Sequence, residues 1–84
     1  MYKVVINKSA QKDLDKIPNK YYANVSDHLL SLENNPFQDG VKKLQGHENL
    51  YRLRVGVYRI IYQIIKKELV VTVIKIAHRK DAYK

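Results

Sequence analysis

The sequence contains no cysteine, so the chain forms no disulfide and does no chemistry through a thiolate. It also has no apolar run near the roughly 20 residues that span a membrane. The first residues, "MYKVVINKSAQKD", turn polar too early for a secretory signal. Repeats, low-complexity tracts and linkers are missing as well. These absences predict a cytoplasmic protein with a single domain, residues 1–84, and no membrane partner.

The distribution of charge is more informative than its total. Residues 1–41 hold five lysines and five acids, so their net charge is zero. The whole net charge of +8 therefore lies in residues 42–84. A one-sided basic field favours a polyanion such as nucleic acid, because each neutralised phosphate releases counterions. A solubilising surface is the other interpretation.

The first part of the chain predicts one strand and two helices. "YKVVIN" (2–7) is short and β-branched, which favours a strand. Ser9 is the expected cap of a first helix that Pro18 ends, and Asn19 is the expected cap of a second helix that "NNP" stops. Apolar residues at helical spacing mark the buried faces of the two helices: Ala10, Leu14, Ile17, Tyr22, Val25, Leu29 and Leu32.

The second part predicts a loop and then three strands. Residues 37–49 carry two glycines and no clear period, which is typical of a loop. Strands are expected at about 50–55, 58–65 and 69–77. The resulting order, β-α-α-β-β-β, predicts an α+β fold in which a helical hairpin packs on one face of a mainly antiparallel, four-stranded sheet.

The stretch "YRLRVGVYRII" (51–61) predicts a tight hairpin with its arginines on one face. Gly56 and Val57 are the only residues available for the turn, and Gly in the first central position indicates type II′. The register then places Val55 opposite Tyr58 and Arg54 opposite Arg59. Side chains alternate along a strand, so one set faces the helices: Tyr51, Leu53, Val55, Tyr58, Ile60 and Tyr62.

Arg52, Arg54 and Arg59 share the open face in this register. Like charges directly opposite each other on neighbouring strands are destabilising. An 84-residue chain has a thin core and can spare little stability. A bound phosphate would turn the repulsion into a clamp, since guanidinium groups match phosphate oxygens in a bidentate way.

The connection "KKE" (66–68) leaves the register of the last strand open. A three-residue loop brings Lys75, Ala77 and Arg79 onto the arginine face, whereas a two-residue loop brings His78 there. The three-residue loop also predicts an exposed apolar band beside the arginines, formed by Ile61, Ile65, Leu69, Val71 and Val73.

Three motifs in this order, "KLQG", "YRLRVGVYRIIY" and "HRKDAY", resemble the RelE/ParE superfamily of bacterial type II toxins, and specifically its RelE-type, ribosome-dependent mRNA interferases. The resemblance covers essentially the whole chain. It implies a toxin that enters the ribosomal A site and cuts mRNA by attack of the substrate's own 2′-hydroxyl on the adjacent phosphate, with no metal or other cofactor. The three histidines indeed show no metal-ligand spacing, and the acids form no cluster.

The same resemblance implies the roles of individual residues. Arg52 and Arg54 match basic positions that are lysines in some RelE-type members, and Arg59 matches the arginine of the "YR" pair. Arg79 matches the basic residue after the last strand, and Tyr83 matches a C-terminal tyrosine that stacks on or protonates the substrate. These cations would stabilise the charge that grows on the phosphate oxygens.

The arginines raise the question of the general base, because arginine stays protonated and is a poor base. His78 is the expected substitute, since imidazole titrates near neutral pH; a histidine at a strand end is just as often structural. Lys42, Lys43, Lys75 and Lys80 are the expected contacts to mRNA and ribosomal RNA.

The expected partners are a cognate antitoxin, mRNA and the 70S ribosome, with a toxin–antitoxin hetero-oligomer as the inhibited form. We expect a mainly helical antitoxin segment, disordered when free, to cover the apolar band or the adjoining helices. Two rival functions stay open: a ParE-like inhibitor of DNA gyrase, which is not an enzyme, and an inactive RNA-binding module.

Overall fold

The computed structural model describes residues 1–80 of the chain, and residues 81–84 are outside that description. It confirms the α+β class and the element order, with one additional strand. The elements are β1 (Lys3–Ile6), α1 (Lys8–Asp15), α2 (Asn19–Ser31), β2 (Lys42–Lys43), β3 (Leu50–Val55), β4 (Tyr58–Ile65) and β5 (Val70–His78). The sheet predicted to have four strands has five, because the loop segment at Lys42 and Lys43 pairs with β3.

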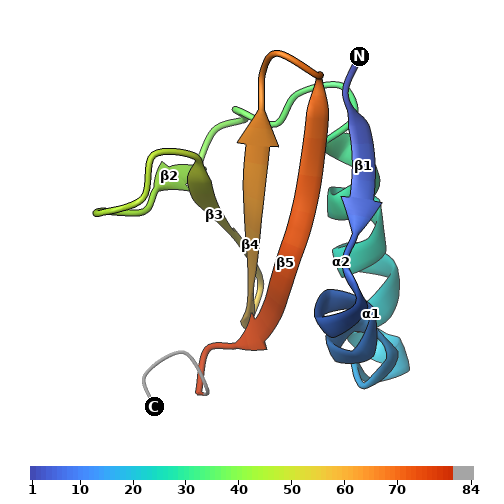
Figure 1. The fold of residues 1–84 in the computed structure, drawn as a ribbon. Helices are drawn as coiled ribbons and strands as arrows, with labels where there is room; N and C mark the ends of the chain where they lie inside the picture. The colour runs from blue at the N-terminus through green and yellow to red at the C-terminus, as the bar shows by residue number, and fades with distance from the viewer. Residues whose placement is uncertain (81–84) are drawn as a thin grey trace.

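The strands form a single mixed sheet in the order β1-β5-β4-β3-β2 (Figure 1). β1 runs parallel to β5, and the other three pairings are antiparallel. β5 therefore lies inside the sheet, between the first strand of the chain and β4. The long connection that this parallel pair requires contains both helices and the strands β2, β3 and β4.

The N-cap of helix α1 lies two residues earlier than the predicted cap, Ser9. Asn7 is the N-cap, and its Oδ1 accepts a hydrogen bond of 2.8 Å from the backbone N–H of Ala10. Ser9 consequently lies inside the helix. In α2, Asn19 is the first helical residue and Pro18 takes the cap position. Among the described residues, no helix is long and apolar enough to cross a membrane.

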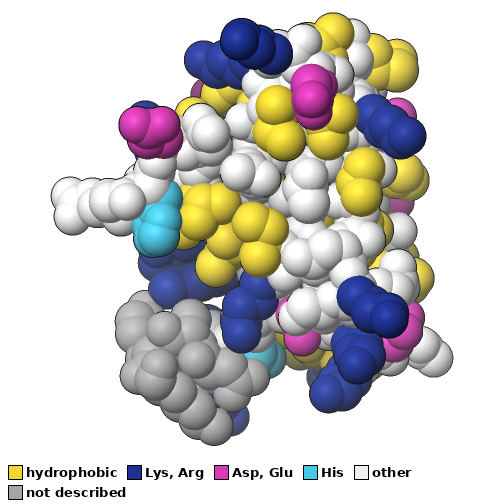
Figure 2. Space-filling view, viewed as in Figure 1, with side chains coloured by type: hydrophobic (Ala, Val, Ile, Leu, Met, Phe, Trp, Pro, Cys, Tyr) yellow, Lys and Arg dark blue, Asp and Glu magenta, His cyan; other side chains and the backbone are white. Residues whose placement is uncertain are grey.

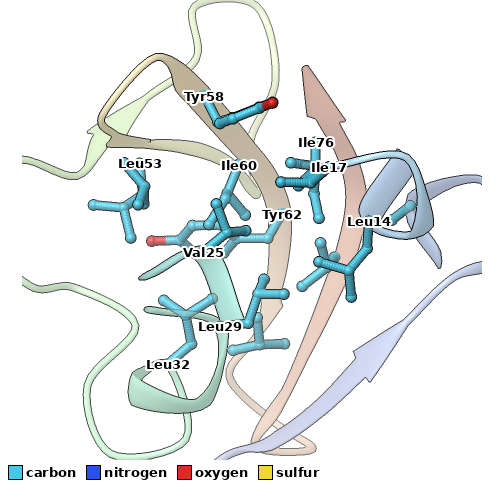
Figure 3. Packing of buried hydrophobic residues seen from close by; sticks show 14 of the residues in the cluster. Leu14, Ile17, Val25, Leu29, Leu32, Leu53, Tyr58, Ile60, Tyr62 and Ile76 are labelled. Atoms are coloured by element: carbon cyan, nitrogen blue, oxygen red, sulfur yellow. The ribbon is translucent and has the colours of Figure 1, made fainter. Parts of the chain in front are cut away.

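The core lies between the helices and one face of the sheet. Figure 3 shows Leu14 of α1, and Val25 and Leu29 of α2, pointing toward Ile60 and Tyr62 of β4. Strands β3 and β4 supply every second residue to this core, as their alternation predicts. The buried hydrophobic residues are Ala10, Leu14, Ile17, Val25, Leu29, Leu32, Leu53, Val55, Tyr58, Ile60, Tyr62, Ile64, Val71, Val73, Ile76 and Ala77.

Tyr62 is the largest fully buried side chain. Its hydroxyl donates a hydrogen bond of 2.7 Å to the backbone carbonyl of Pro36, so its polar atom is satisfied inside the core. Burial, with a smaller contribution from the nearby Tyr51, raises the pKa of the Tyr62 phenol well above its usual value. The bond ties the segment after α2 to the centre of β4.

The β3–β4 hairpin has the predicted register, with Val55 opposite Tyr58 and Arg54 opposite Arg59. Gly56 has φ 60°, in the region that costs glycine little. Leu69 is the only other described residue besides Gly40 and Gly46 with positive φ, so Val57 keeps a negative φ. A positive φ at the first central position alone is the pattern of a type II′ turn.

The β4–β5 connection differs from both predicted loops. Ile65 pairs with Val70, so four residues, 66–69, connect the strands. The last of them, Leu69, has φ 56°, the left-handed region that side chains with a Cβ rarely adopt. This register turns Val71 and Val73 into the core, where both are 0% exposed.

A β-bulge then reverses the alternation of β5. Tyr62 pairs with Val73, but Ile61 pairs with Lys75, which leaves Ile74 as the extra residue. Beyond the bulge, Lys75 and Ala77 face the same side as Ile61 and Arg59. The structure therefore reaches the predicted arginine-face set by a longer loop and a bulge.

Candidate anion-binding site

The site is built on the sheet face that no helix covers. Arg54 of β3 and Arg59 of β4 lie directly opposite each other there, and Ala77 of β5 lies opposite Arg59 on its other side. Cβ atoms in such opposed positions are about 5 Å apart, which brings two guanidinium groups within reach of one anion.

Arg79 joins this pair from the segment that follows β5. Its backbone N–H donates a hydrogen bond of 2.7 Å to the carbonyl of Val57, in the hairpin turn. The three arginines line one cavity of about 170 Å³, together with Gly56, Val57 and Tyr58. Drug-sized ligands need pockets of about 300–1,000 Å³, so this cavity suits a small anionic group such as a phosphate.

A second row of basic residues crosses the same face next to this cavity. Lys42 of β2 pairs with Arg52 of β3, Arg52 pairs with Ile61, and Ile61 pairs with Lys75. Figure 2 shows basic side chains gathered toward the lower end of β3 and β4, with hydrophobic side chains above them. This row extends the positive surface from the cavity to the sheet edge.

Two of the predicted RNA contacts lie elsewhere. Lys43 pairs with Tyr51, which places its side chain on the face opposite Lys42. There it lines a groove of about 440 Å³ with Lys66 and Lys67. Lys80 is exposed and directly follows Arg79. Tyr83 is outside the described residues.

His78, the predicted general base, does not line the arginine cavity. The bulge places it opposite Tyr58, on the helix side of the sheet, where the two rings meet edge to face at 5.4 Å between centroids. Its Nδ1 accepts a hydrogen bond of 3.1 Å from the backbone N–H of Lys80. Of the two registers that the sequence left open, the one that brings His78 onto the arginine face is not found, because the four-residue loop and the bulge turn its side chain to the helix side.

The predicted apolar band also needs correction. Val71 and Val73 are buried, so they offer no outer surface. Other residues of β5 face outward in their place, and the apolar residues of β3, β4 and β5 on the open face are Leu50, Ile61, Ile65, Val70 and Ile74. All five are partly exposed. An apolar surface therefore lies next to the arginines, as predicted, but it is formed by a different set of residues.

Asp13 makes a contact that the sequence did not predict. Its Oδ2 accepts a hydrogen bond of 3.0 Å from the backbone N–H of Ile76, just beyond the point where β1 stops pairing with β5. The bond holds α1 against the part of β5 that leads to Arg79. The sequence gives no sign of this role for an acid in a helix, since its partner lies 63 residues away. Within residues 1–80, no three metal-ligating side chains are grouped to hold a metal ion.

Comparisons with known proteins agree on one family. Residues 4–83 match the family of ParE toxins of type II toxin–antitoxin systems, parDE. Toxin RelE of Mycobacterium tuberculosis is 33% identical over 84 residues, covering 99% of this chain and 87% of the relative. Toxin RelE1 of Methanocaldococcus jannaschii is 29% identical over 86 residues, covering 99% and 96%.

Solved structures lead to the same family. The toxin in the crystal structure of an archaeal RelE–RelB complex from Pyrococcus horikoshii superposes with a TM-score of 0.82 at 34% identity, covering 93% of this chain and 94% of the other. From this fold and these relatives, the chain belongs to the RelE/ParE superfamily of type II toxins and is a toxin of the RelE type.

Proposed function

We propose that this protein is a cytoplasmic, ribosome-dependent endoribonuclease that cleaves mRNA in the ribosomal A site. The observation that carries the proposal is the cavity in which Arg54, Arg59 and Arg79 meet. Three guanidinium groups around a space of phosphate size have a clear chemical use, because a phosphodiester gains negative charge as its bond is broken. The curated relatives are named as RelE toxins, which is consistent with the proposal.

The proposed reaction uses the RNA as its own nucleophile. The 2′-oxygen forms a bond to the adjacent phosphorus, the bond to the 5′-oxygen of the next nucleotide breaks, and a 2′,3′-cyclic phosphate and a 5′-hydroxyl result. The 2′-hydroxyl gives its proton to a solvent water, and the departing 5′-oxygen gains a proton from an acid. Arginine is suited to neither transfer, because it stays protonated. The predicted proton carrier to the leaving oxygen is Tyr83.

The arginines contribute by stabilising the transition state more than the substrate. Guanidinium groups already fixed around the phosphate cost little reorganisation as charge develops on its oxygens. Arg54 and Arg59 lie directly opposite each other, so both can approach the same phosphate. The more highly charged transition state gains more from the two cations than the substrate does.

The basic row beside the cavity has a different role in this proposal. Lys42, Arg52 and Lys75 lie along the path that an RNA backbone would follow across the open face. Contacts to backbone phosphates supply affinity and position without reading the sequence. Lys43 and Lys80 extend the positive surface to the β2 edge and to the segment after β5. We propose that these residues hold mRNA and ribosomal RNA.

The proposal also includes a cognate antitoxin. The Pyrococcus horikoshii relative is described in complex with RelB. In this chain, the apolar residues of the open face lie next to the arginine cavity, so a segment that covers Ile61, Ile65 and Ile74 would also close access to Arg59. Hydrogen exchange with and without antitoxin tests the idea. Protection should rise across residues 50–78, and unchanged protection in a tight complex would contradict it.

The name of the matching family, ParE toxin, favours a second candidate function. A ParE-like protein would poison DNA gyrase by binding and would not need the arginine cavity. Expression in cells separates the two functions: mapped cuts inside translated codons of mRNA support the endoribonuclease, and DNA breaks without such cuts support gyrase inhibition. An inactive RNA-binding module would produce neither result.

The decisive experiment is cleavage on purified ribosomes programmed with a defined mRNA. Saturating toxin should release a fragment that ends in a 2′,3′-cyclic phosphate, and mRNA with a 2′-deoxy nucleotide at the cut position should stay intact. Cleavage of the deoxy substrate would exclude 2′-hydroxyl attack. No cleavage of either substrate by folded protein would overturn the proposed activity.

A further inference from the structure

We propose that His78 is a positioning residue that holds Arg79 in the arginine cavity through the acceptor at its Nδ1, and that it does not transfer a proton in the reaction. β5 ends at His78, so Arg79 and Lys80 leave the sheet. Two hydrogen bonds fix this exit: Arg79 N–H to the carbonyl of Val57 at 2.7 Å, and Lys80 N–H to His78 Nδ1 at 3.1 Å. Arg79 lies between them.

The imidazole is itself held by the core. Its ring meets Tyr58 edge to face, with centroids 5.4 Å apart and an interplanar angle of 82°. Tyr58 is only 8% exposed and meets Tyr21 of α2 in a second edge contact at 5.7 Å. Such pairs favour defined ring orientations. The row Tyr21, Tyr58, His78 therefore connects helix α2 to the end of β5.

Tyr58 has neighbours on both faces of the sheet. Its ring contacts His78 on the helix side, and it is also one of the residues that line the arginine cavity. A shift of the His78 ring would change the backbone that carries Arg79 and the packing of a cavity wall. His78 thus affects the cavity from the opposite side of the sheet, through its hydrogen bond with Lys80 N–H and its ring contact with Tyr58.

The hydrogen-bonding role of His78 conflicts with a role as general base. Nδ1 accepts from Lys80 N–H, so this nitrogen carries no proton and is already engaged. The ring lines a different cavity, of about 180 Å³, with Asp13, Lys16 and Tyr58 among its neighbours. A base must come within hydrogen-bond reach of the proton that it takes. His78 lies on the wrong side of the sheet for a phosphate held by the three arginines.

A matched pair of variants separates the acceptor from the ring. His78→Asn places Oδ1 near the position of Nδ1, and asparagine readily accepts from the backbone N–H two residues later. His78→Phe keeps an aromatic ring for Tyr58 but has no acceptor. A positioning role predicts that Asn retains function and Phe loses it. A proton-transfer role predicts that both lose function, and a purely packing role predicts that Phe is the milder change.

The first measurement needs no ribosome. Inorganic phosphate is titrated into labelled protein while the arginine Nε–H signals are followed, and Arg79→Ala identifies the signal of Arg79. The parent and His78→Asn should bind phosphate equally. His78→Phe should bind about tenfold more weakly, the order expected for one lost charged hydrogen bond. Equal binding by His78→Phe, or equally weak binding by His78→Asn, would overturn the inference.

A double-mutant cycle tests whether His78 acts through Arg79. In an Arg79→Ala background, His78→Phe should cause no further loss of phosphate binding, because the group that it positions is gone. A full additional loss would show that His78 acts by another route, which contradicts the proposal. His78→Leu repeats the test with a second side chain that has no acceptor, and thermal unfolding identifies any variant that fails to fold.

The cleavage arm of this test rests on the proposed function. On programmed ribosomes, His78→Asn should cleave mRNA at nearly the parent rate. His78→Phe should be slower by about 10²-fold, as small displacements of a catalytic group can be. If the parent does not cleave but the phosphate pattern holds, the proposed function fails and the positioning role stands. If the parent cleaves and His78→Asn does not, the positioning role fails alone.

Discussion

The two faces of the sheet are supplied by the same strands but meet different surroundings. Ile60 and Ile61 are neighbours on β4; Ile60 is 0% exposed beneath the helices, whereas Ile61 lies on the open face between Arg52 and Lys75. The covered face holds apolar residues and the satisfied hydroxyl of Tyr62. The open face holds Arg52, Arg54, Arg59 and Lys75. Strand alternation therefore separates the residues that stabilise the fold from those proposed to bind RNA.

The sharpest test of this separation is the pair Ile60→Ala and Ile61→Ala. Ile60→Ala should lower the free energy of unfolding by about 2–5 kcal/mol, because it opens a cavity in a packed core. Ile61→Ala removes the same atoms from a partly exposed site and should cost about 1 kcal/mol or less. Denaturant unfolding of both variants measures the difference. Equal losses would show that the open face is packed as tightly as the covered one.

The second test is Arg54→Gln, which should remove function and leave the fold intact. We expect the single-turnover rate of mRNA cleavage to fall by about 10²-fold, the order seen when one fixed charge-stabilising group is lost. The thermal midpoint should stay the same or rise slightly, because an opposed pair of like charges has gone.

Lys8→Gln is the matched control, since it removes one positive charge from the exposed start of α1. Its cleavage rate should stay close to that of the parent. Comparable losses in both variants would mean that only the net charge of the protein matters. An Arg54→Gln variant that is inactive because it is unfolded would also contradict the separation of the two faces.

A smaller effect is expected at Asp13, which connects the covered side to the strand that leads to Arg79. Asp13→Ala should lower the free energy of unfolding by about 1.5 kcal/mol, because the N–H of Ile76 loses a charged acceptor. Asp13→Asn keeps an acceptor oxygen and should lose less. Hydrogen exchange of the Ile76 amide gives a local readout. Unchanged exchange in Asp13→Ala would mean that this bond is absent in solution.

The smallest effect concerns Tyr62 and alkaline pH. Burial raises its pKa in the folded state, so its contribution to stability is complete below the unfolded value of 10.0 and is lost as the pH rises above it. Over that range the parent should lose up to about 1.4 kcal/mol per pH unit more than Tyr62→Phe. At neutral pH, Tyr62→Phe should cost about 1 kcal/mol through the lost bond to Pro36. Parallel pH curves would contradict the burial of the hydroxyl.

The sequence was sufficient for features set by neighbouring residues. The hairpin register follows from Gly56, because both two-residue hairpin turns need a positive φ at the first central position and Gly adopts it readily. That register alone puts Arg54 and Arg59 on one face. The helices were also predictable from their apolar spacing, although Asn7 competes successfully with Ser9 for the cap position.

Features set by distant partners were not predictable in this way. The two residues of β2 become a strand only because β3 is available to pair with them. The β4–β5 register depends on a left-handed Leu69 and on the bulge at Ile74. A signal for the bulge did exist: Thr72 and Lys75 are polar but three residues apart, so both cannot face outward from a regular strand.

The position of β5 in the sheet has a consequence for how the protein is made. Chains are synthesised from the N-terminus, yet β1 pairs with β5. Lys3 therefore cannot pair until Val70 has been synthesised. A growing chain that has completed both helices and the β3–β4 hairpin still lacks the strand that joins them. Arg79 follows that strand directly, so the cavity cannot assemble on a partly folded chain. The proposed activity therefore cannot appear before β5 has folded, because β5 completes the sheet and places Arg79, the third arginine, at the cavity.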